Sequence, residues 1–242
     1  MATLPFGGGM GSDSLLNPGD LTLNTSAQQF VLGARATIGP RSFRYVLAGG
    51  TALVQGKLQQ APAENTAFQD MAPAAAAIGA VAVTITPGAT TATANQYADG
   101  WLVVTVTPGE GYIYQISSHA AISSSTAFVA NLKDAIQVAL TTSSRLDMVS
   151  NPYKNVIVNP STASSAPVGA AVYPVTNAQF GWIQDGGVAS LLADGTVTVG
   201  TGVVASNATA GAVEALTGVQ APVGTALTGG ATTEYCAIDL DL

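Results

Sequence analysis

The chain has 242 residues, of which 9% are charged and 48% are hydrophobic, and its formal net charge is −7. With seven basic residues against fourteen acidic ones, no basic surface is available to bind phosphates, so nucleic acid is excluded as an expected partner. No stretch of about 18 apolar residues runs without polar or turn residues, and a membrane partner is therefore not expected. Because average soluble domains are roughly 25% charged, the low charge content indicates a surface largely covered by other protein.

Residues 1–30 are rich in Gly, Asn, Ser and Asp and contain the turn sequences FGGGMGS and NPGD. We interpret this segment as an extended N-terminal arm rather than as a domain. It has no basic stretch followed by an apolar one, so no secretory signal is predicted and folding in a cytoplasm is expected.

Residues 31–150 are predicted to form a β-rich domain, because short runs of Val, Ile, Thr, Tyr and Phe alternate with Gly, Pro and Asn. The clearest local unit is WLVVTVTPGEGYIYQIS, in which PGEG separates two β-rich runs. Proline presets the backbone of a turn and glycine accepts positive φ, so this unit predicts a hairpin.

Residues 126–140 allow two interpretations. Phe128, Leu132, Ile136 and Leu140 recur every four residues, as they would along one face of a helix. The same residues also fit two strands that are broken by a turn at Lys133 and Asp134. The β-rich sequence on both sides favours the strands, and the fold class predicted is all-β, with antiparallel barrel or sandwich modules and little helix.

The rest of the chain is divided by a proline-containing segment. Residues 151–167 hold three prolines and a Ser/Thr/Ala cluster, which predicts a linker or a long loop. Residues 168–242 are predicted to form a small C-terminal β-barrel with hairpins at DGG and TGGAT. The sequence APVG occurs twice, at residues 166–169 and 221–224. Each copy is predicted to start a strand, where proline needs no hydrogen-bond partner and glycine lets neighbouring backbone approach closely.

Residues that could carry catalysis are few and scattered. His119 is the only histidine and is interpreted as a polar loop residue, while alternation in EYCAIDLDL places Cys236 on the core face of a strand. Asp239 and Asp241 share a face of that strand and fit either a cation site at a subunit contact or, as we favour, solvated edge charges. No catalytic residue, cofactor or metal ligand is assigned, and the chain is not expected to be an enzyme.

Several phrases in the C-terminal sequence carry a family resemblance: a GW dipeptide, LADGT, a VVASNATAGAVEA stretch and VGTAL, at residues 181–182, 192–196, 203–215 and 223–227. Together they resemble the small β-barrel decoration, or cement, proteins of tailed-bacteriophage capsids. The resemblance implies a structural virion protein that is made in the cytoplasm of a bacterial host and binds the outer surface of the capsid. It also implies the phage major capsid protein as partner and a homo-oligomer, a trimer or a dimer, over joints between capsid subunits.

Within this interpretation the N-terminal arm is the part expected to contact the capsid. The candidate contact residues are its apolar side chains Phe6, Leu15, Leu16, Leu21 and Leu23. The alternative for Leu21 and Leu23 is an ordinary first strand of the protein's own barrel.

Two other functions stay open at this point. One is a receptor- or glycan-binding head fibre or tail appendage, for which Trp101, Tyr112 and Tyr114 would supply a surface aromatic cluster. The other is the major capsid protein itself, which is disfavoured because the sequence lacks the long helix expected of that fold.

Overall fold

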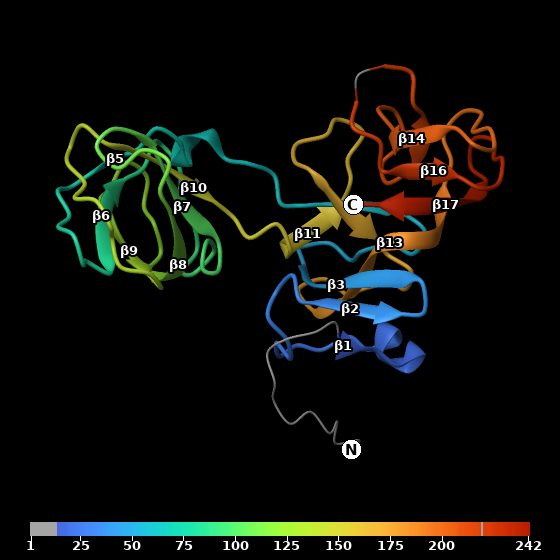
Figure 1. Cartoon of the computed structure of the whole chain (residues 1–242), viewed down its shortest axis with the longest axis horizontal. Helices are drawn as coiled ribbons and strands as arrows, with labels where there is room; N and C mark the ends of the chain where they lie inside the picture. The colour runs from blue at the N-terminus through green and yellow to red at the C-terminus, as the bar shows by residue number, and fades with distance from the viewer. Residues whose placement is uncertain (1–13, 219) are drawn as a thin grey trace.

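A computed structural model describes residues 14–218 and 220–242 of the chain. The structure is nearly all β, with 42% of residues in strands and 4% in helical turns, which confirms the predicted fold class. Among the described residues there is no α-helix, and the two helical turns are the 3-10 segments η1 (Pro18–Thr22) and η2 (Thr66–Phe68). The strands form two sheets, and Figure 1 shows the two bodies side by side.

The smaller body is a closed six-stranded barrel. Its sheet order is β10-β7-β8-β9-β6-β5. The strands are β5 (Ala72–Pro73), β6 (Ala82–Thr86), β7 (Trp101–Val106), β8 (Ile113–His119), β9 (Phe128–Leu132) and β10 (Arg145–Val149). The sheet closes because Met71, just before β5, and Leu146 in β10 exchange backbone hydrogen bonds of 3.0 and 2.9 Å. Closure removes the exposed sheet edges that would otherwise pair with other chains.

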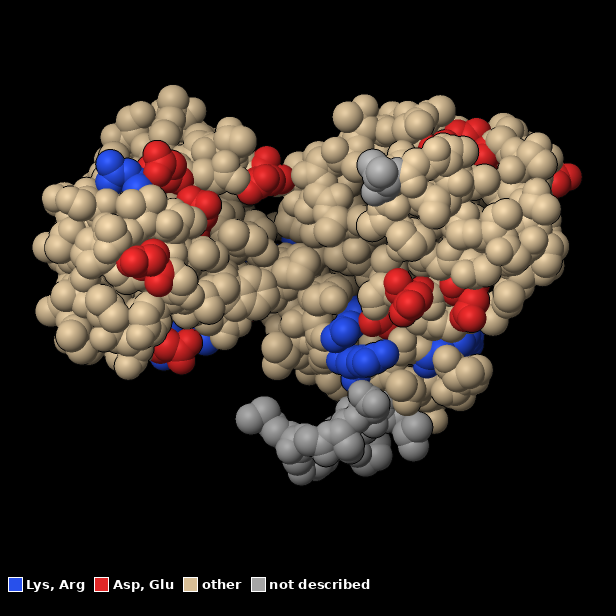
Figure 2. Space-filling model, turned by 45° about the horizontal axis from the view of Figure 1, so that its top comes forward, with Lys and Arg blue, Asp and Glu red and all other residues tan. Residues whose placement is uncertain are grey.

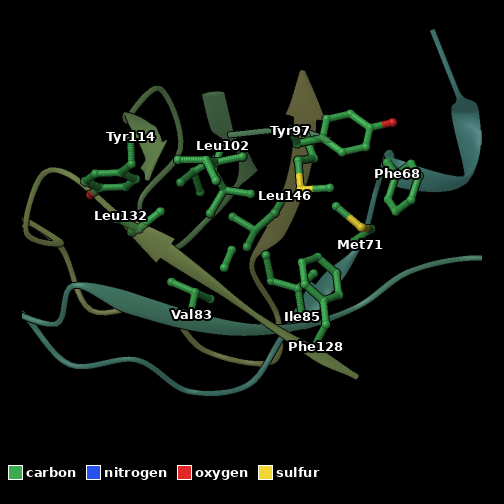
Figure 3. Close-up of a cluster of buried hydrophobic side chains, with 14 of the residues drawn as sticks. Phe68, Met71, Val83, Ile85, Tyr97, Leu102, Tyr114, Phe128, Leu132 and Leu146 are labelled. Carbon is green, nitrogen blue, oxygen red and sulfur yellow. The ribbon is translucent and has the colours of Figure 1, made fainter. Parts of the chain in front are cut away.

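The barrel interior is filled by side chains that all come from residues 68–148. Figure 3 shows Leu102 and Leu146 in the middle of this cluster, with Phe68, Ile85 and Phe128 around them. Leu102, Leu146, Phe68 and Ile85 are each less than 1% exposed. The barrel therefore has an apolar core of its own.

The local predictions within the barrel are largely confirmed. Strands β7 and β8 form the antiparallel hairpin expected around PGEG, with Leu102 opposite Tyr114. Residues 128–132 form strand β9, as the strand interpretation required. The second predicted strand there is not formed as such: Ile136 and Leu140 are buried in the barrel, but only Leu140 makes a bridge, to Ala76.

The larger body contains the eleven-stranded sheet, in the order β1-β2-β3-β11-β4-β12-β13-β17-β16-β14-β15. Its N-terminal strands are β1 (Ser14–Leu15), β2 (Arg35–Ile38), β3 (Arg41–Ala48) and β4 (Leu58–Gln60). The others are β11 (Lys154–Val158), β12 (Pro167–Ala170), β13 (Phe180–Leu192), β14 (Gly202–Ala205), β15 (Val213–Ala215), β16 (Gly224–Ala226) and β17 (Tyr235–Asp241). Because β13 pairs with both β12 and β3, the strands β3, β11, β4, β12 and β13 close into a ring.

The boundaries of the two sheets differ from the segments predicted from the sequence. Strands β2 to β4 come from the predicted domain 31–150, yet they belong to the same sheet as β11 to β17. The predicted linker 151–167 was wrong for its central part, since β11 lies there and pairs with β3 and β4. The run KNVIV is a strand former between two prolines, and burial in the ring outweighs the turn signals around it. The six-stranded barrel is therefore an insertion between β4 and β11.

The predicted hairpin at DGG, residues 185–187, was also wrong. Strand β13 is 13 residues long and runs through DGG without reversing direction. Its first part, residues 180–186, pairs with β3, and its second part, residues 186–192, pairs with β17. The register shifts between Gln184 and Gly186, and Gly187 has a φ of +77°. A Cβ at Gly187 would lie 2.7 Å from the carbonyl oxygen of Pro40. The glycines thus serve a bend between two parts of one sheet and not a chain reversal.

Both APVG copies start strands, as predicted: the first starts β12 and the second leads into β16. A Cβ on Gly169 would lie 2.7 Å from the carbonyl oxygen of Gln184, and one on Gly224 would overlap the carbonyl oxygen of Asp239. The hairpin around TGGAT is confirmed by the antiparallel pairing of β16 with β17. Cys236 is 1% exposed on the core face of β17, which confirms its predicted position.

Replacing Gly224 by alanine should destabilise the protein by about 2 kcal/mol, because the added methyl group meets backbone that cannot move aside. Gly50→Ala is the control, since no atom lies within 4 Å of a Cβ there. Urea unfolding measures both variants. Equal urea midpoints for Gly224→Ala and Gly50→Ala would contradict the close approach of β16 to β17.

Candidate functional site

Capsid contact was assigned to the N-terminal segment from the sequence. From residue 14 onward, most of this segment belongs to the larger body. Phe6 lies outside the described residues, and Leu15 belongs to β1, which pairs in parallel with β2. Leu16 and Leu21 are buried, at 9% and 4% exposed. They are part of the protein's own core, which corrects their assignment as contacts; Leu21 lies on η1 and not on a first strand. Leu23 is 52% exposed and available to a partner.

An aromatic cluster holds this segment in place. The ring of Tyr45 lies 5.2 Å from that of Phe30, 5.8 Å from that of Phe180 and 5.1 Å from that of Trp182, measured between centroids. Thr25 and Phe180 exchange backbone hydrogen bonds of 3.1 and 2.8 Å. The predicted extended arm is therefore wrong for residues 14–30, where aromatic packing outweighs the turn-rich local sequence.

A groove of about 600 Å³ lies on the larger body, and we call it the tyrosine groove. Its lining residues are Arg41, Gln55, Gly56, Val172, Tyr173, Val188, Ala189, Ser190 and Tyr235. The second part of β13 contributes residues 188–190, and the first residues of β3 and β17 contribute Arg41 and Tyr235. The loops at residues 55–56 and 172–173 contribute the rest. The volume lies within the range of small-molecule sites, roughly 300–1,000 Å³.

Backbone hydrogen bonds fix the loops that border the tyrosine groove. Leu53 and Val175 exchange two, at 2.8 and 3.1 Å, which ties the two loops together. The amide of Gly56 donates to the carbonyl of Ala171, and the amide of Leu192 donates to the carbonyl of Gly56, both at 2.8 Å. The groove is consequently preformed, and a ligand would not have to order it.

The two tyrosines present much of their rings to solvent. Tyr235 is 55% exposed and Tyr173 is 39% exposed. Tyr235 packs over Gly56, whose φ is +70° and where any Cβ would overlap the ring. This contact sets the position of the Tyr235 ring at the edge of the groove.

Sequence reasoning did not select the groove residues, although one signal pointed to Tyr235. The alternation in EYCAIDLDL puts Cys236 inside and Tyr235 outside, as the structure shows. Tyr173 and Arg41 come from distant parts of the chain, and only the pairing of β3 with β13 and of the bordering loops brings them to one groove.

The aromatic cluster proposed for a receptor-binding alternative is not assembled on the surface. Tyr112 is 41% exposed and stacks on Tyr114 at 6.2 Å between ring centroids, but Tyr114 is only 2% exposed. Trp101 is half-buried and lines a different cavity of about 430 Å³ together with Tyr97 and Pro152.

Residues that could perform chemistry are not gathered in one place. Among residues 14–218 and 220–242, no group of three or more His, Cys, Asp or Glu side chains is placed to hold a metal ion. Asp239 and Asp241 are both exposed on β17. Cys236 is buried, and burial raises the pKa of its thiol, which keeps it protonated and unreactive.

His119 is buried and not the polar loop residue that the sequence suggested. It ends β8, is 3% exposed and accepts a hydrogen bond of 3.0 Å at Nε2 from the amide of Tyr97. Because Nε2 accepts, Nδ1 carries the proton and donates to the carbonyl of Ala120 at 2.7 Å. Burial lowers the pKa of His119, and the positive charge of Lys154 lowers it further. The ring is a neutral structural connector within the barrel.

Comparison of the chain with models of protein families, with curated proteins and with solved structures finds no match. Within the described part of the chain, no helix has the length and apolar character needed to cross a membrane.

The pKa of His119 makes the stability of the protein depend on pH. Its folded pKa lies below the ordinary value of 6.5, so the unfolded chain binds more protons. Stability should therefore fall as the pH drops from about 7 to about 5, with a smaller fall in His119→Gln, where no ring can be protonated. Urea midpoints across this pH range measure the effect. Parallel curves for the two proteins would show that His119 is not the group responsible.

Proposed function

We propose that the chain is a structural virion protein that binds the outer surface of an assembled tailed-phage capsid and cements contacts between major capsid subunits. The observation that carries the proposal is a β surface with few charges and many exposed apolar side chains. On the face drawn in Figure 2, charged groups are few and wide uncharged areas separate them. Such a surface is expected where other protein covers it in the assembly.

Exposed apolar residues occur on the outward faces of strands in both bodies. Ile113 and Val129 are 56% and 46% exposed on the barrel, and Val188 is 46% exposed on the larger body. Burying such side chains against a partner contributes about 25 cal/mol for each Å² of apolar surface removed from water. A homo-oligomer, a trimer or a dimer, would cover part of this surface and the capsid another part.

The proposed mechanism is mass action. A protein that binds only the assembled lattice stabilises it by its binding free energy, about 2.7 kcal/mol when its concentration is a hundred times Kd. Many copies on one shell act together, so each contact can be weak. This role needs no catalysis, and the buried positions of His119 and Cys236 support it.

The set of N-terminal contact residues proposed from the sequence is now smaller. Leu16 and Leu21 are used by the core, so the candidate contacts that we retain are Phe6, Leu15 and the exposed Leu23.

The location can be tested on particles purified from the phage that carries the gene. We expect the protein on the outer surface of the capsid in hundreds of copies, measured by quantitative mass spectrometry and by gold-labelled antibodies on intact particles. A handful of copies at one site would favour a fibre or tail appendage instead. Absence from the particles would overturn the proposal.

Leu23→Ser should weaken attachment to capsids that lack the protein by about tenfold, because an apolar side chain of this size contributes roughly 1.5 kcal/mol when buried. Deleting residues 1–13 should weaken attachment as well. Ser124→Ala, at an exposed polar side chain of the barrel, serves as the control. Co-sedimentation measures binding, and a thermal melt verifies that each variant is folded. Full binding by Leu23→Ser and by the protein that lacks residues 1–13 would rule out the N-terminal contact.

A further inference from the structure

The tyrosine groove contains a cation without a partner. Arg44, Lys133 and Arg145 are ion-paired, with Asp185, Asp99 and Asp70 respectively. In contrast, the guanidinium of Arg41 makes no ion pair or hydrogen bond with any residue in 14–218 or 220–242. Its contact is with the ring of Phe43, 5.4 Å from the centroid. A guanidinium presents several hydrogen-bond donors in a planar fork that fits a carboxylate. The groove therefore offers a binding site for a carboxylate group.

The charge around Arg41 favours a singly charged group. Asp239 in β17 lies opposite Val188, one of the residues that line the groove. Its negative charge opposes the accumulation of further negative charge near the groove. A carboxylate, with one charge, therefore suits the site better than a doubly charged phosphate.

The other groove side chains suit a hydroxylated ring. Tyr173 and Tyr235 offer exposed aromatic faces, against which the apolar face of a sugar ring can lie. Their phenol groups, the amide of Gln55 and the hydroxyl of Ser190 make no side-chain hydrogen bond with another described residue, so they are available to hydroxyl groups.

An extended peptide would find only a short strand edge in this groove. Strand β13 is flanked by β17 along residues 186–192, while on its other side β3 pairs only as far as Gly186 and the amide of Leu192 donates to the carbonyl of Gly56, so the open edge is confined to residues 188–191. Recognition by strand addition needs unpaired backbone groups. A compact ligand that is recognised by side chains fits the groove better.

We propose that the tyrosine groove binds an acidic saccharide, that is, a sugar whose ring carries a carboxylate. Arg41 pairs with the carboxylate, the two tyrosines contact the ring, and Gln55 and Ser190 bind its hydroxyl groups. This inference goes beyond the capsid role and does not depend on it, because the groove belongs to a single copy of the chain.

The test measures binding by the purified full chain with isothermal calorimetry and by chemical-shift changes in the sugar spectrum. The probes are trigalacturonic acid, its uncharged methyl ester, 3′-sialyllactose, maltotriose and, as an acidic peptide, tetraglutamate. Arg41→Gln removes the carboxylate partner, and Tyr173→Ala removes an exposed ring that no described residue needs for a hydrogen bond. Arg35→Gln is the matched control, since Arg35 is exposed on the neighbouring β2 and outside the groove.

We expect at least one acidic sugar to bind with a Kd of about 1 mM or tighter, and the uncharged sugars to bind more weakly. Arg41→Gln should weaken binding of the acid by about tenfold or more and leave the weak binding of the ester unchanged, while Arg35→Gln should change neither. Tyr173→Ala should weaken both.

Three results would overturn the inference. The first is a Kd weaker than about 1 mM for both acidic sugars. The second is equal loss in Arg41→Gln and Arg35→Gln, which would show non-specific attraction. The third is binding of tetraglutamate as tight as that of the sugars, which would point to an acidic peptide. None of these outcomes bears on whether the protein is found on phage capsids, so the two proposals can fail separately.

Discussion

The bend in strand β13 is the constraint on which the larger body depends. Its first part closes the five-stranded ring with β3 and β12, and its second part carries β17 and the C-terminal strands. The side-chain amide nitrogen of Gln184 lies 2.9 to 3.0 Å from the carbonyl oxygens of Gly186, Gly187 and Val188, so its two N–H groups are shared among these three acceptors and hold the backbone of the bend. Beside it, the buried Asp185 pairs with Arg44 at 2.6 Å. The residues directly after the bend line the tyrosine groove, so the same feature that joins the two parts of the sheet also creates the concave surface.

The inserted barrel is attached by polar contacts at its base. Lys154 at the start of β11 donates to the carbonyls of Asn95 and Ala98 at 2.7 and 3.0 Å, and the Asn151 amide donates to the carbonyl of Asp99 at 3.2 Å. Burial lowers the pKa of Lys154, although the nearby Asp99 acts in the opposite direction. Because each body has a separate apolar core, these few bonds orient the barrel and do not create its fold. A chain of this kind presents two β surfaces with few charges, one on each body, and the proposed bridging of capsid subunits would use both.

The proposed functions rest largely on different residues, although Val188 belongs both to the exposed apolar surface and to the lining of the tyrosine groove. The proposal of capsid binding is based on the low charge content and the N-terminal segment, which the sequence had already indicated, and on the exposed apolar strand residues, which only the structure revealed. Saccharide binding is argued from Arg41, Tyr173 and Tyr235, which lie far apart in the sequence. The contact residues predicted from the sequence were only partly suitable, because an apolar side chain in a turn-rich segment serves a core as well as it serves a partner. Leu16 and Leu21 show this: their sequence context is that of an arm, but the aromatic rings of Tyr45 and Trp182 provide a core for them.

Features that depend on a few neighbouring residues were determined by the sequence alone. The all-β class, the hairpin at PGEG, the strand starts at both APVG copies and the buried position of Cys236 follow from turn chemistry and from two-residue alternation, which act over short distances. Features that depend on long-range pairing were decided only by the tertiary structure. The bend at DGG, strand β11 within the expected linker, the burial of His119 and the assembly of the tyrosine groove each require a partner strand or loop from far along the chain. The same local sequence permits a turn or a strand, and the hydrogen bonds and burial supplied by that distant partner select between them.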